Sequence, residues 1–84
     1  MDRVYILIST NYDEPYSEDN MKVFGNKEDA ENALNERTLE IRGRLDPYWD
    51  VEGWSYASCD YENVFMINEK REWYSIKIIA EDVY

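Results

Sequence analysis

Residues 26–43 read NKEDAENALNERTLEIRG and carry the clearest helix signal in the chain. Asn26 is a favourable N-cap, and an acidic residue stands three positions later, at the capping-box position. Gly43 can end the helix in a left-handed cap, and Pro47 prevents it from resuming. The pattern therefore predicts a helix over about residues 27–42. Its buried face repeats at helical spacing and consists of Ala30, Ala33, Leu34, Thr38 and Ile41.

Strand-like runs flank this helix on both sides. β-Branched and aromatic residues are typical of strands, and they concentrate at residues 3–9, 21–24, 54–60, 63–68 and 73–80. The last two runs are joined by a charged turn without glycine, which favours a four-residue hairpin loop. A helix with one apolar stripe covers one face of a sheet, and the other face then carries part of the aromatic surplus, exposed or paired with a partner. We therefore expect a single α+β domain over residues 1–84, an antiparallel sheet of four to five strands with one helix packed on one face.

The composition points away from nucleic acid and membranes. Nineteen Asp and Glu against nine Lys and Arg give a formal net charge of −10 over 84 residues. No basic stripe exists to displace counterions from nucleic acid, so direct nucleic-acid binding is not expected, whereas a basic protein would be attracted. No apolar stretch approaches the roughly 20 residues that span a bilayer. An alternative is that the acidity only keeps a small protein soluble.

The single cysteine, Cys59, cannot form an internal disulfide. This is typical of a reducing compartment, and we expect a cytoplasmic protein. The run around Cys59 is strand-like, so we expect its thiol to be a small buried side chain rather than a reactive group. Eight Tyr and three Trp are unusual in so short a chain. Such rings offer a large contact area at low entropic cost and favour a binding surface.

The residues do not favour catalytic or metal chemistry. The chain has no His, which excludes Ser-His and Cys-His nucleophiles and imidazole metal ligands. Carboxylates are plentiful, but a catalytic carboxylate pair needs a deep cleft, which a small domain with one helix rarely forms. Asp13, Glu14, Glu18 and Asp19 lack EF-hand spacing, so solvated loop charge is expected there. We therefore expect no enzyme, no catalytic residues, no bound metal and no cofactor.

The segment from Leu45 to Glu69 contains no Lys or Arg. Its carboxylates alternate with large amphipathic rings, a combination suited to recognition by a basic surface. Rings carried on exposed loops anchor an interface when a partner desolvates them. We predict that this segment binds a basic protein partner through Asp46, Tyr48, Trp49, Asp50, Glu52, Trp54, Tyr56, Asp60 and Glu62.

The first half of the chain also resembles a known group of proteins. Residues 23–30, VFGNKEDA, follow a strand that starts RVYIL at residue 3 and lead into the predicted helix. This order of strand, loop, VFxxxExA and helix is similar to that of small, mostly uncharacterised proteins of bacteria, prophages and phages. The resemblance implies no activity. It does imply an origin on a mobile element, where small acidic proteins often bind and block a host factor.

Two classes of function follow from these observations. In the first, the protein is a small acidic inhibitor or adaptor that occupies the basic groove of a nucleic-acid-binding host protein by surface mimicry, its carboxylates standing in for phosphates. In the second, it is a small-molecule or ion-binding module, or an accessory domain, whose aromatic residues line a pocket. A homodimer formed through the aromatic face is a further alternative, in which the acidity serves solubility alone.

Overall fold

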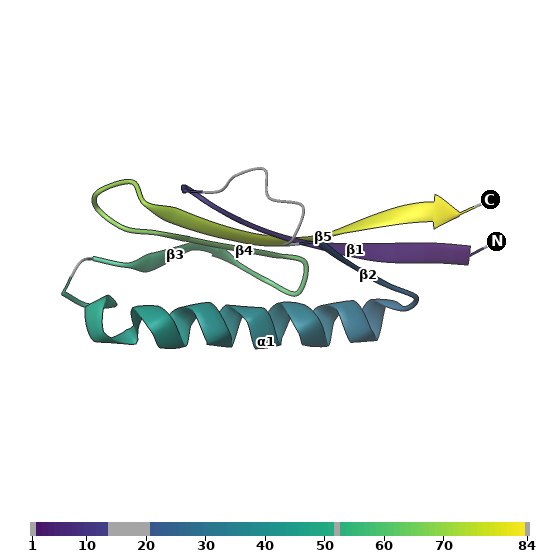
Figure 1. Ribbon diagram of the computed structural model, residues 1–84, viewed down its shortest axis with the longest axis horizontal. Coiled ribbons are helices and arrows are strands. Elements are labelled where there is room, and N and C mark those ends of the chain that lie inside the picture. Colours follow the sequence, from purple (N-terminus) through teal and green to yellow (C-terminus); the bar gives the residue numbers. More distant parts are fainter. Residues whose placement is uncertain (1, 14–20, 52, 84) are drawn as a thin grey trace.

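The computed structural model describes residues 2–13, 21–51 and 53–83 and confirms the predicted α+β arrangement (Figure 1). In chain order the elements are β1 (Asp2–Asn11), β2 (Met21–Phe24), α1 (Lys27–Leu45), the 3-10 helix η2 (Asp46–Tyr48), β3 (Ser55–Cys59), β4 (Asn63–Ile67) and β5 (Trp73–Val83). The strands form one antiparallel sheet in the order β2-β1-β5-β4-β3, and α1 lies across one of its faces. Each strand run predicted from the sequence is therefore present.

The start of α1 is fixed by side-chain capping. Asn26 Oδ1 accepts a hydrogen bond from the Asp29 backbone N–H at 2.8 Å, and Asn26 Nδ2 donates to Asp29 Oδ2 at 2.9 Å. The predicted end of the helix was wrong, because Gly43 lies inside α1, which continues to Leu45. Pro47 then occupies the first turn of η2. In the first turn of a helix the backbone N–H groups have no partner within the helix, so the N–H that proline lacks is not needed there. Pro47 therefore allows the helical path to continue instead of ending it.

One row of residues holds α1 on the sheet. As the spacing predicted, Ala30, Leu34, Thr38 and Ile41 are buried, whereas Ala33 is only half-buried. Thr38 Oγ1 donates to the Leu34 carbonyl at 2.8 Å, so the buried hydroxyl is satisfied. The sheet contributes alternate residues of its helix-side face, and those that are at most 5% exposed are Leu7, Val64, Met66 and Ile76. This single apolar layer is the core of the molecule.

The opposite face of the sheet carries no helix in the described parts of the chain. Phe65 and Trp73 stack on that face with ring centroids 5.9 Å apart and an interplanar angle of 24°. Ile79, Met21 and Val23 occupy the same face by register and are 36%, 47% and 63% exposed. Phe65 and Trp73 therefore place part of the aromatic surplus on the uncovered face, as expected, and an exposed aliphatic patch lies on the same face.

β1 and β5 form a long two-stranded ribbon. They pair along their whole lengths, whereas β2 pairs with β1 only over residues 5–8 and β4 pairs with β5 only over residues 73–77. Mutual pairing explains why both strands are longer than their residue propensities predicted. The start of β1 and the end of β5 lie together at the tip of this ribbon (Figure 1), and the molecule measures 48 × 23 × 18 Å.

The hairpin between β4 and β5 closes more tightly than the four-residue loop that was predicted. The backbone N–H of Asn68 donates to the Glu72 carbonyl at 3.0 Å, which leaves only residues 69–71 in the loop. Arg71 adopts a left-handed conformation with φ of 66°. The Asn68 side chain accepts hydrogen bonds from the backbone N–H groups of Lys70 and Glu72, each at 3.0 Å. These bonds hold Arg71 in a conformation that glycine usually supplies in so short a loop.

Glu72 also ties this hairpin to the end of β1. Hydrogen bonds from the Tyr12 hydroxyl and from Asn68 Nδ2, the latter at 3.1 Å, lower the pKa of Glu72 from its usual value of 4.5. The bond to Glu72 also raises the pKa of Tyr12 to about 12. The backbone N–H of Tyr12 donates to the Trp73 carbonyl at 3.1 Å, so the contact continues the pairing of β1 with β5.

Tyr12→Phe should therefore have a pH-dependent effect on stability. A carboxylate whose pKa is lower in the folded state stabilises the fold above its unfolded pKa, and this stabilisation is lost as the pH falls through the folded pKa. We expect the loss of unfolding free energy caused by Tyr12→Phe to be largest near neutral pH and to shrink below about pH 4.5, as measured by urea denaturation at each pH. Tyr48→Phe, at an exposed position, is the control and should show no such trend. A constant difference for Tyr12→Phe would mean that Glu72 does not depend on this hydroxyl.

Leu34→Ala should destabilise the protein strongly, because it leaves a cavity beneath the helix. Truncation of a buried leucine costs about 2–5 kcal/mol. Leu39→Ala is the matched control, since Leu39 lies on the same helix but is 61% exposed, and its truncation should cost less than about 0.5 kcal/mol. Urea denaturation measures both differences. Equal losses in the two variants would contradict the packing of α1 through Leu34.

Candidate functional site

A groove runs along the edge of the sheet where α1 faces β3. α1 packs mainly on β1, β5 and β2, so β3, the outermost strand on the other side, extends beyond the helix. The space between them, called here the α1–β3 groove, has a volume of about 630 Å³. Its base contains Leu34, Thr38 and Val64, and its walls contain Glu31, Asn32, Asn35, Cys59, Asp60 and Tyr61.

Cys59 shows how the groove arises. It lies opposite Val64 in the register of β3 and β4 and therefore shares the helix-side face with it. Val64 is buried in the core, whereas Cys59 is exposed, because α1 reaches Val64 but does not extend over β3. The prediction of a buried thiol was wrong for this reason.

Aromatic residues lie beyond the groove, toward the C-terminus of α1. Trp49 packs on Tyr56 with ring centroids 5.2 Å apart. The Arg42 guanidinium lies over both rings, 4.7 Å from the centroid of Trp49 and 5.6 Å from that of Tyr56. Arg42 Nη1 also donates to the Tyr56 hydroxyl at 3.3 Å. These two predicted contact rings are thus half-buried against a cation, and the exposed predicted residues of this end are Asp46, Tyr48 and Asp50.

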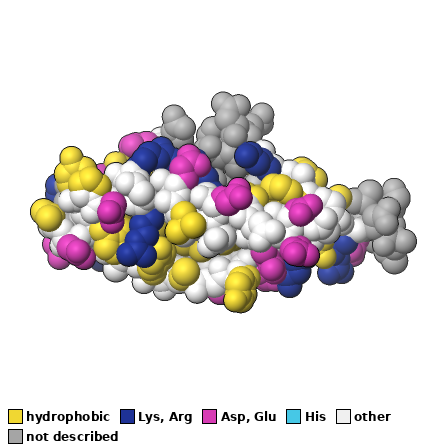
Figure 2. Space-filling view, turned by 90° about the horizontal axis from the view of Figure 1, so that it is seen from below, with side chains coloured by type: hydrophobic (Ala, Val, Ile, Leu, Met, Phe, Trp, Pro, Cys, Tyr) yellow, Lys and Arg dark blue, Asp and Glu magenta, His cyan; other side chains and the backbone are white. Residues whose placement is uncertain are grey.

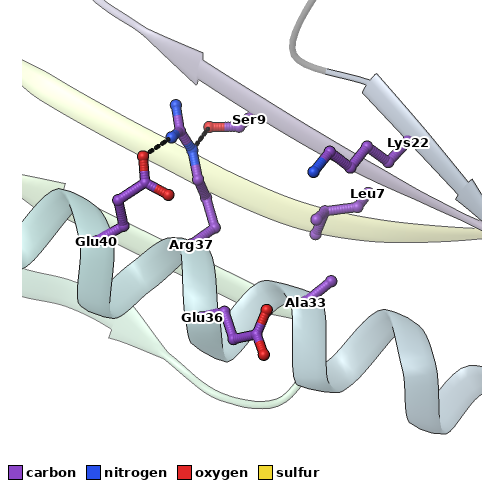
Figure 3. A pocket seen from close by; sticks show the side chains of 7 residues that line it. All are labelled: Leu7, Ser9, Lys22, Ala33, Glu36, Arg37 and Glu40. Carbon is purple, nitrogen blue, oxygen red and sulfur yellow. Dashed lines mark hydrogen bonds and ion pairs between the residues drawn. The ribbon is translucent and has the colours of Figure 1, made fainter.

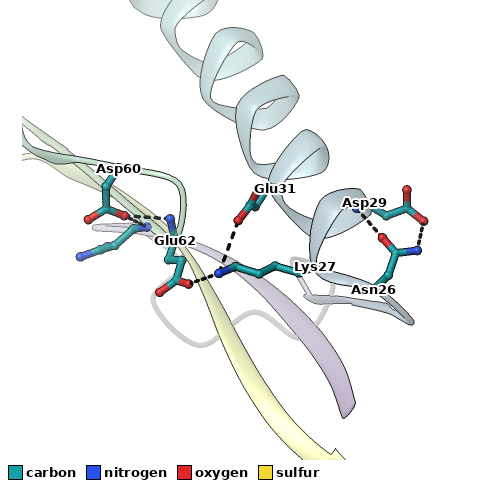
Figure 4. A network of polar contacts seen from close by, with 7 residues as sticks. Asn26, Lys27, Asp29, Glu31, Asp60 and Glu62 are labelled. Carbon is teal, nitrogen blue, oxygen red and sulfur yellow. Dashed lines mark hydrogen bonds and ion pairs between the residues drawn. The ribbon is translucent and has the colours of Figure 1, made fainter. Parts of the chain in front are cut away.

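The turn between β3 and β4 lies at the other end of the groove, near the N-terminus of α1 (Figure 4). Asp60 Oδ1 accepts hydrogen bonds from the backbone N–H groups of Glu62 at 2.8 Å and Asn63 at 2.7 Å. Lys27 Nζ forms ion pairs with Glu62 Oε1 at 3.1 Å and with Glu31 Oε1 at 3.8 Å. The hydrogen bond to Glu62 raises the pKa of Lys27. Asp60 therefore fixes the turn, and Glu62 holds the turn to the helix.

The structure separates the predicted contact residues into two groups. The acids of the η2 end and those of the β3–β4 turn are separated by the length of β3, about 17 Å. Trp54 belongs to neither group, because it is 6% exposed and packs on Tyr74 with ring centroids 5.6 Å apart. Its expected role as an exposed anchor is therefore corrected to a role in the core. Glu52 lies outside the described residues.

Acidic and basic side chains are mixed on the helix side of the molecule. Figure 2 shows Asp and Glu interspersed with Lys and Arg over this face rather than gathered in one field. Arg37 and Arg44 pair with Glu40 at 2.7 and 3.5 Å along α1, while Arg42 and Lys27 approach the two ends of the groove. The segment that has no positive charge in the sequence thus acquires cations from α1 in space. Only the fold reveals this contribution, because the cations come from a different part of the chain.

The groove presents polar and apolar groups that can bind a partner. Its walls present the carboxamides of Asn32 and Asn35 and carboxylates at the rim, around an apolar base.

Across residues 2–13, 21–51 and 53–83, no three Cys, Asp or Glu side chains converge as metal ligands would. Of the acidic run near the start of the chain, only Asp13 is described, and its backbone N–H donates to Asn11 Oδ1 at 2.8 Å.

Comparison with family models, curated proteins and solved structures found no match. None of the helices in the described parts of the chain has the length and apolar character needed to cross a membrane. The inference of function therefore rests on the geometry of the groove and on the residues around it.

Cys59 provides a direct probe of the groove. Because its thiol is exposed in the folded protein, a reagent such as DTNB should label the native protein at a rate close to that of the urea-unfolded protein. Asn35→Trp, which places a large ring in the groove, should slow the labelling. Leu39→Trp, which adds the same ring on the exposed side of α1, should not. A thiol that reacts only after unfolding would contradict the open groove.

Proposed function

We propose that this protein is a non-catalytic module that binds a basic protein partner in the α1–β3 groove. The observation that carries the proposal is a groove of about 630 Å³ with an apolar base, which lies between the two acidic ends of the predicted contact segment. A partner segment that lies along the groove would reach residues of both ends at once.

Exposed side chains at the rim provide the area for such a contact. Tyr61 is 79% exposed and stands beside the groove, where Cys59 is exposed as well. Covering a large ring next to an apolar base removes apolar area from water and excludes water from neighbouring polar contacts. Asn32 and Asn35 on the opposite wall carry donors and acceptors suited to a peptide backbone.

β3 is an edge strand with little protection against pairing with a strand of another chain. Sheet edges are normally guarded by Lys, Pro or inward-pointing charges, but β3 reads SYASC over residues 55–59. Most of its side chains are small, so another chain can approach its backbone closely. A bulge between Tyr56 and Ser58 interrupts the register with β4, which limits strand addition to short segments on either side.

Charge favours a basic partner. The formal net charge of −10 attracts a basic protein from a distance and accelerates its encounter. Within the contact, Glu31 and Asp60 line the groove, and Asp46 and Asp50 are exposed beyond it. Exposed ion pairs contribute roughly 0–1 kcal/mol each. The charges therefore act on rate and orientation, and the affinity depends on the apolar contact.

An inhibitor of a nucleic-acid-binding host protein is the form of this proposal that fits the charge best. The carboxylates would stand in for phosphates in the basic groove of the host protein, without turnover. The resemblance of the first half of the chain to small phage and prophage proteins supports an origin on a mobile element. The single Cys59 supports a reducing compartment such as the cytoplasm.

Capture of a partner from host lysate tests the proposal when the amount captured by wild type is compared with that captured by two variants of α1. The wild-type protein should retain a stoichiometric basic partner, Asn35→Trp should lose it because the groove is filled, and Leu39→Trp should retain it. The bound partner should protect Cys59 from thiol labelling. Raising the salt concentration from about 50 to about 500 mM should weaken the complex, because the Debye length falls to a few Å.

Charge-reversal variants and competition with nucleic acid test two parts of the proposal separately: binding in the α1–β3 groove and mimicry of phosphates. Asp46→Lys combined with Asp50→Lys should weaken binding more than either change alone, since each exposed pair contributes little. Equal capture by wild type and Asn35→Trp would contradict the groove as the binding site. A complex that nucleic acid does not displace would contradict mimicry of phosphates and leave the groove in place.

The uncovered sheet face supports a second candidate, a homodimer. Met21, Val23 and Ile79 expose aliphatic side chains there, next to the stacked rings of Phe65 and Trp73. Covering this patch with a second copy would remove it from water. Sedimentation of the isolated protein distinguishes the two candidates, because only the homodimer raises the mass without a partner.

A further inference from the structure

A second cavity lies on the opposite flank of α1, between the helix and the strands β1 and β2 (Figure 3). Its volume is about 210 Å³, and none of its lining residues lines the α1–β3 groove. It forms because β2 pairs with β1 only as far as Ile8, so that no described strand continues the sheet beside Ser9. The helix contributes the small side chain of Ala33 at this point, which leaves the space open.

Donors without a partner among the described residues gather around Ser9, and they come from β1, from β2 and from α1 (Figure 3). Ser9 is 6% exposed, and its Oγ accepts a long hydrogen bond from Arg37 Nε at 3.4 Å, while its hydroxyl proton meets no acceptor among the described residues. Arg37 also donates from Nη1 to Glu40 Oε1 at 2.7 Å, and the remaining N–H groups of its guanidinium bond to no described residue. Lys22 extends over Leu7 toward Ser9 (Figure 3) and forms no ion pair with a described residue.

α1 also contributes one carboxylate that has no partner among the described residues. Glu36 stands on α1 near Ala33 (Figure 3) and pairs with no cation of the described chain. Glu40 is already engaged by Arg37 at 2.7 Å and by Arg44 Nη2 at 3.5 Å. The cavity therefore combines free donors around Ser9 with a free carboxylate near Ala33, and the apolar side chains of Leu7 and Ala33 also line it.

We propose that this cavity binds a small zwitterion of the amino-acid type. Its carboxylate accepts hydrogen bonds from Lys22 Nζ, from the Ser9 hydroxyl and from the unused N–H groups of Arg37. Its ammonium faces Glu36, and a short aliphatic side chain lies on the apolar part of the wall. The volume of about 210 Å³ corresponds to about seven water molecules at roughly 30 Å³ each, which is sufficient for an amino acid the size of leucine.

The balance of charge selects a zwitterion over a simple anion or amine. Lys22 and Arg37 offset Glu36 and Glu40, so the cavity is formally neutral within a chain of net charge −10. A simple anion would be repelled by the field of the whole protein and would leave Glu36 without a partner. A simple amine would leave Lys22 and Ser9 without an acceptor. A ligand with both charges satisfies both sides and adds no net charge.

An NMR titration of the full chain with L-leucine tests this proposal. We expect saturable shifts of the backbone amides of Ser9, Lys22 and Arg37, with a dissociation constant on the order of 1 mM. 4-Methylpentanoate lacks the ammonium and 3-methylbutylamine lacks the carboxylate, and each should bind about tenfold more weakly than leucine. Binding of 4-methylpentanoate as tight as that of leucine would overturn the zwitterion assignment.

Two lysine variants form a matched pair for the same titration. Lys22 and Lys77 are both exposed strand residues, but Lys77 lies on the uncovered face of the sheet. Lys22→Met should weaken leucine binding about tenfold, whereas Lys77→Met should leave it unchanged. Glu36→Gln should remove the preference for leucine over 4-methylpentanoate. Equal binding by wild type and Lys22→Met, or no saturable shift at Ser9 up to the solubility of leucine, would overturn the proposal.

Discussion

α1 is held against the sheet by one row of side chains, from Ala30 to Ile41, and the sheet is wider than the helix that this row can place. A helix with its side chains is about 10–12 Å across, whereas five strands at about 4.8 Å spacing extend over roughly 19 Å. α1 packs on β1, β5 and β2 and therefore leaves a strip uncovered along β3, and a second strip lies on its other flank beyond the short pairing of β2. The α1–β3 groove and the cavity beside β2 are these two strips: the groove arises because the sheet is wider than the helix, and the cavity arises because β2 pairs with β1 only as far as Ile8.

The two strips differ in what partly fills them. On the β3 side, large rings extend the core sideways: Trp54 is buried, and Trp49 and Tyr56 cover the edge of the core together with Arg42. The groove lies beyond these rings and keeps an apolar base. On the β2 side, the long polar side chains of Lys22 and Arg37 line the gap instead. An apolar strip beside an exposed edge strand suits a protein partner, whereas a polar and charge-balanced cavity suits a small ligand.

Features of the fold that depend on local pattern were predictable from the sequence. The capped start of α1 at Asn26, its buried face with Leu34, and the positions of the strands each rest on residues that are close in the chain. Features that depend on distant partners were not. Gly43 stays helical, β1 and β5 lengthen each other, and Cys59 is exposed only because the helix lies away from β3.

The same distinction between local pattern and distant partners applies to the candidate site. The contact residues within 46–62 were expected to form one surface, but the structure places their acids at the two ends of β3 and buries Trp54. Alternation alone does not tell which ring of such a segment turns inward, so the burial of Trp54 had no signal in its own neighbourhood. The charge of the segment is likewise changed by residues outside it, since Lys27 and Arg42 come from α1. The cavity beside β2 joins Ser9 to Arg37, residues that only the packing of α1 brings together.

A domain of this size has only a few kcal/mol of stability, and its core is a single layer. Any occupant that binds only the folded state adds to that stability in proportion to the logarithm of its concentration relative to its dissociation constant. Both strips border α1, with Asn35 on one flank and Glu36 and Arg37 on the other. An occupant of either strip would thus contact a side of α1 that lies outside its buried row of residues. Filling both strips with apolar side chains would stabilise the isolated chain, but it would remove the polar groups and the open edge on which recognition depends.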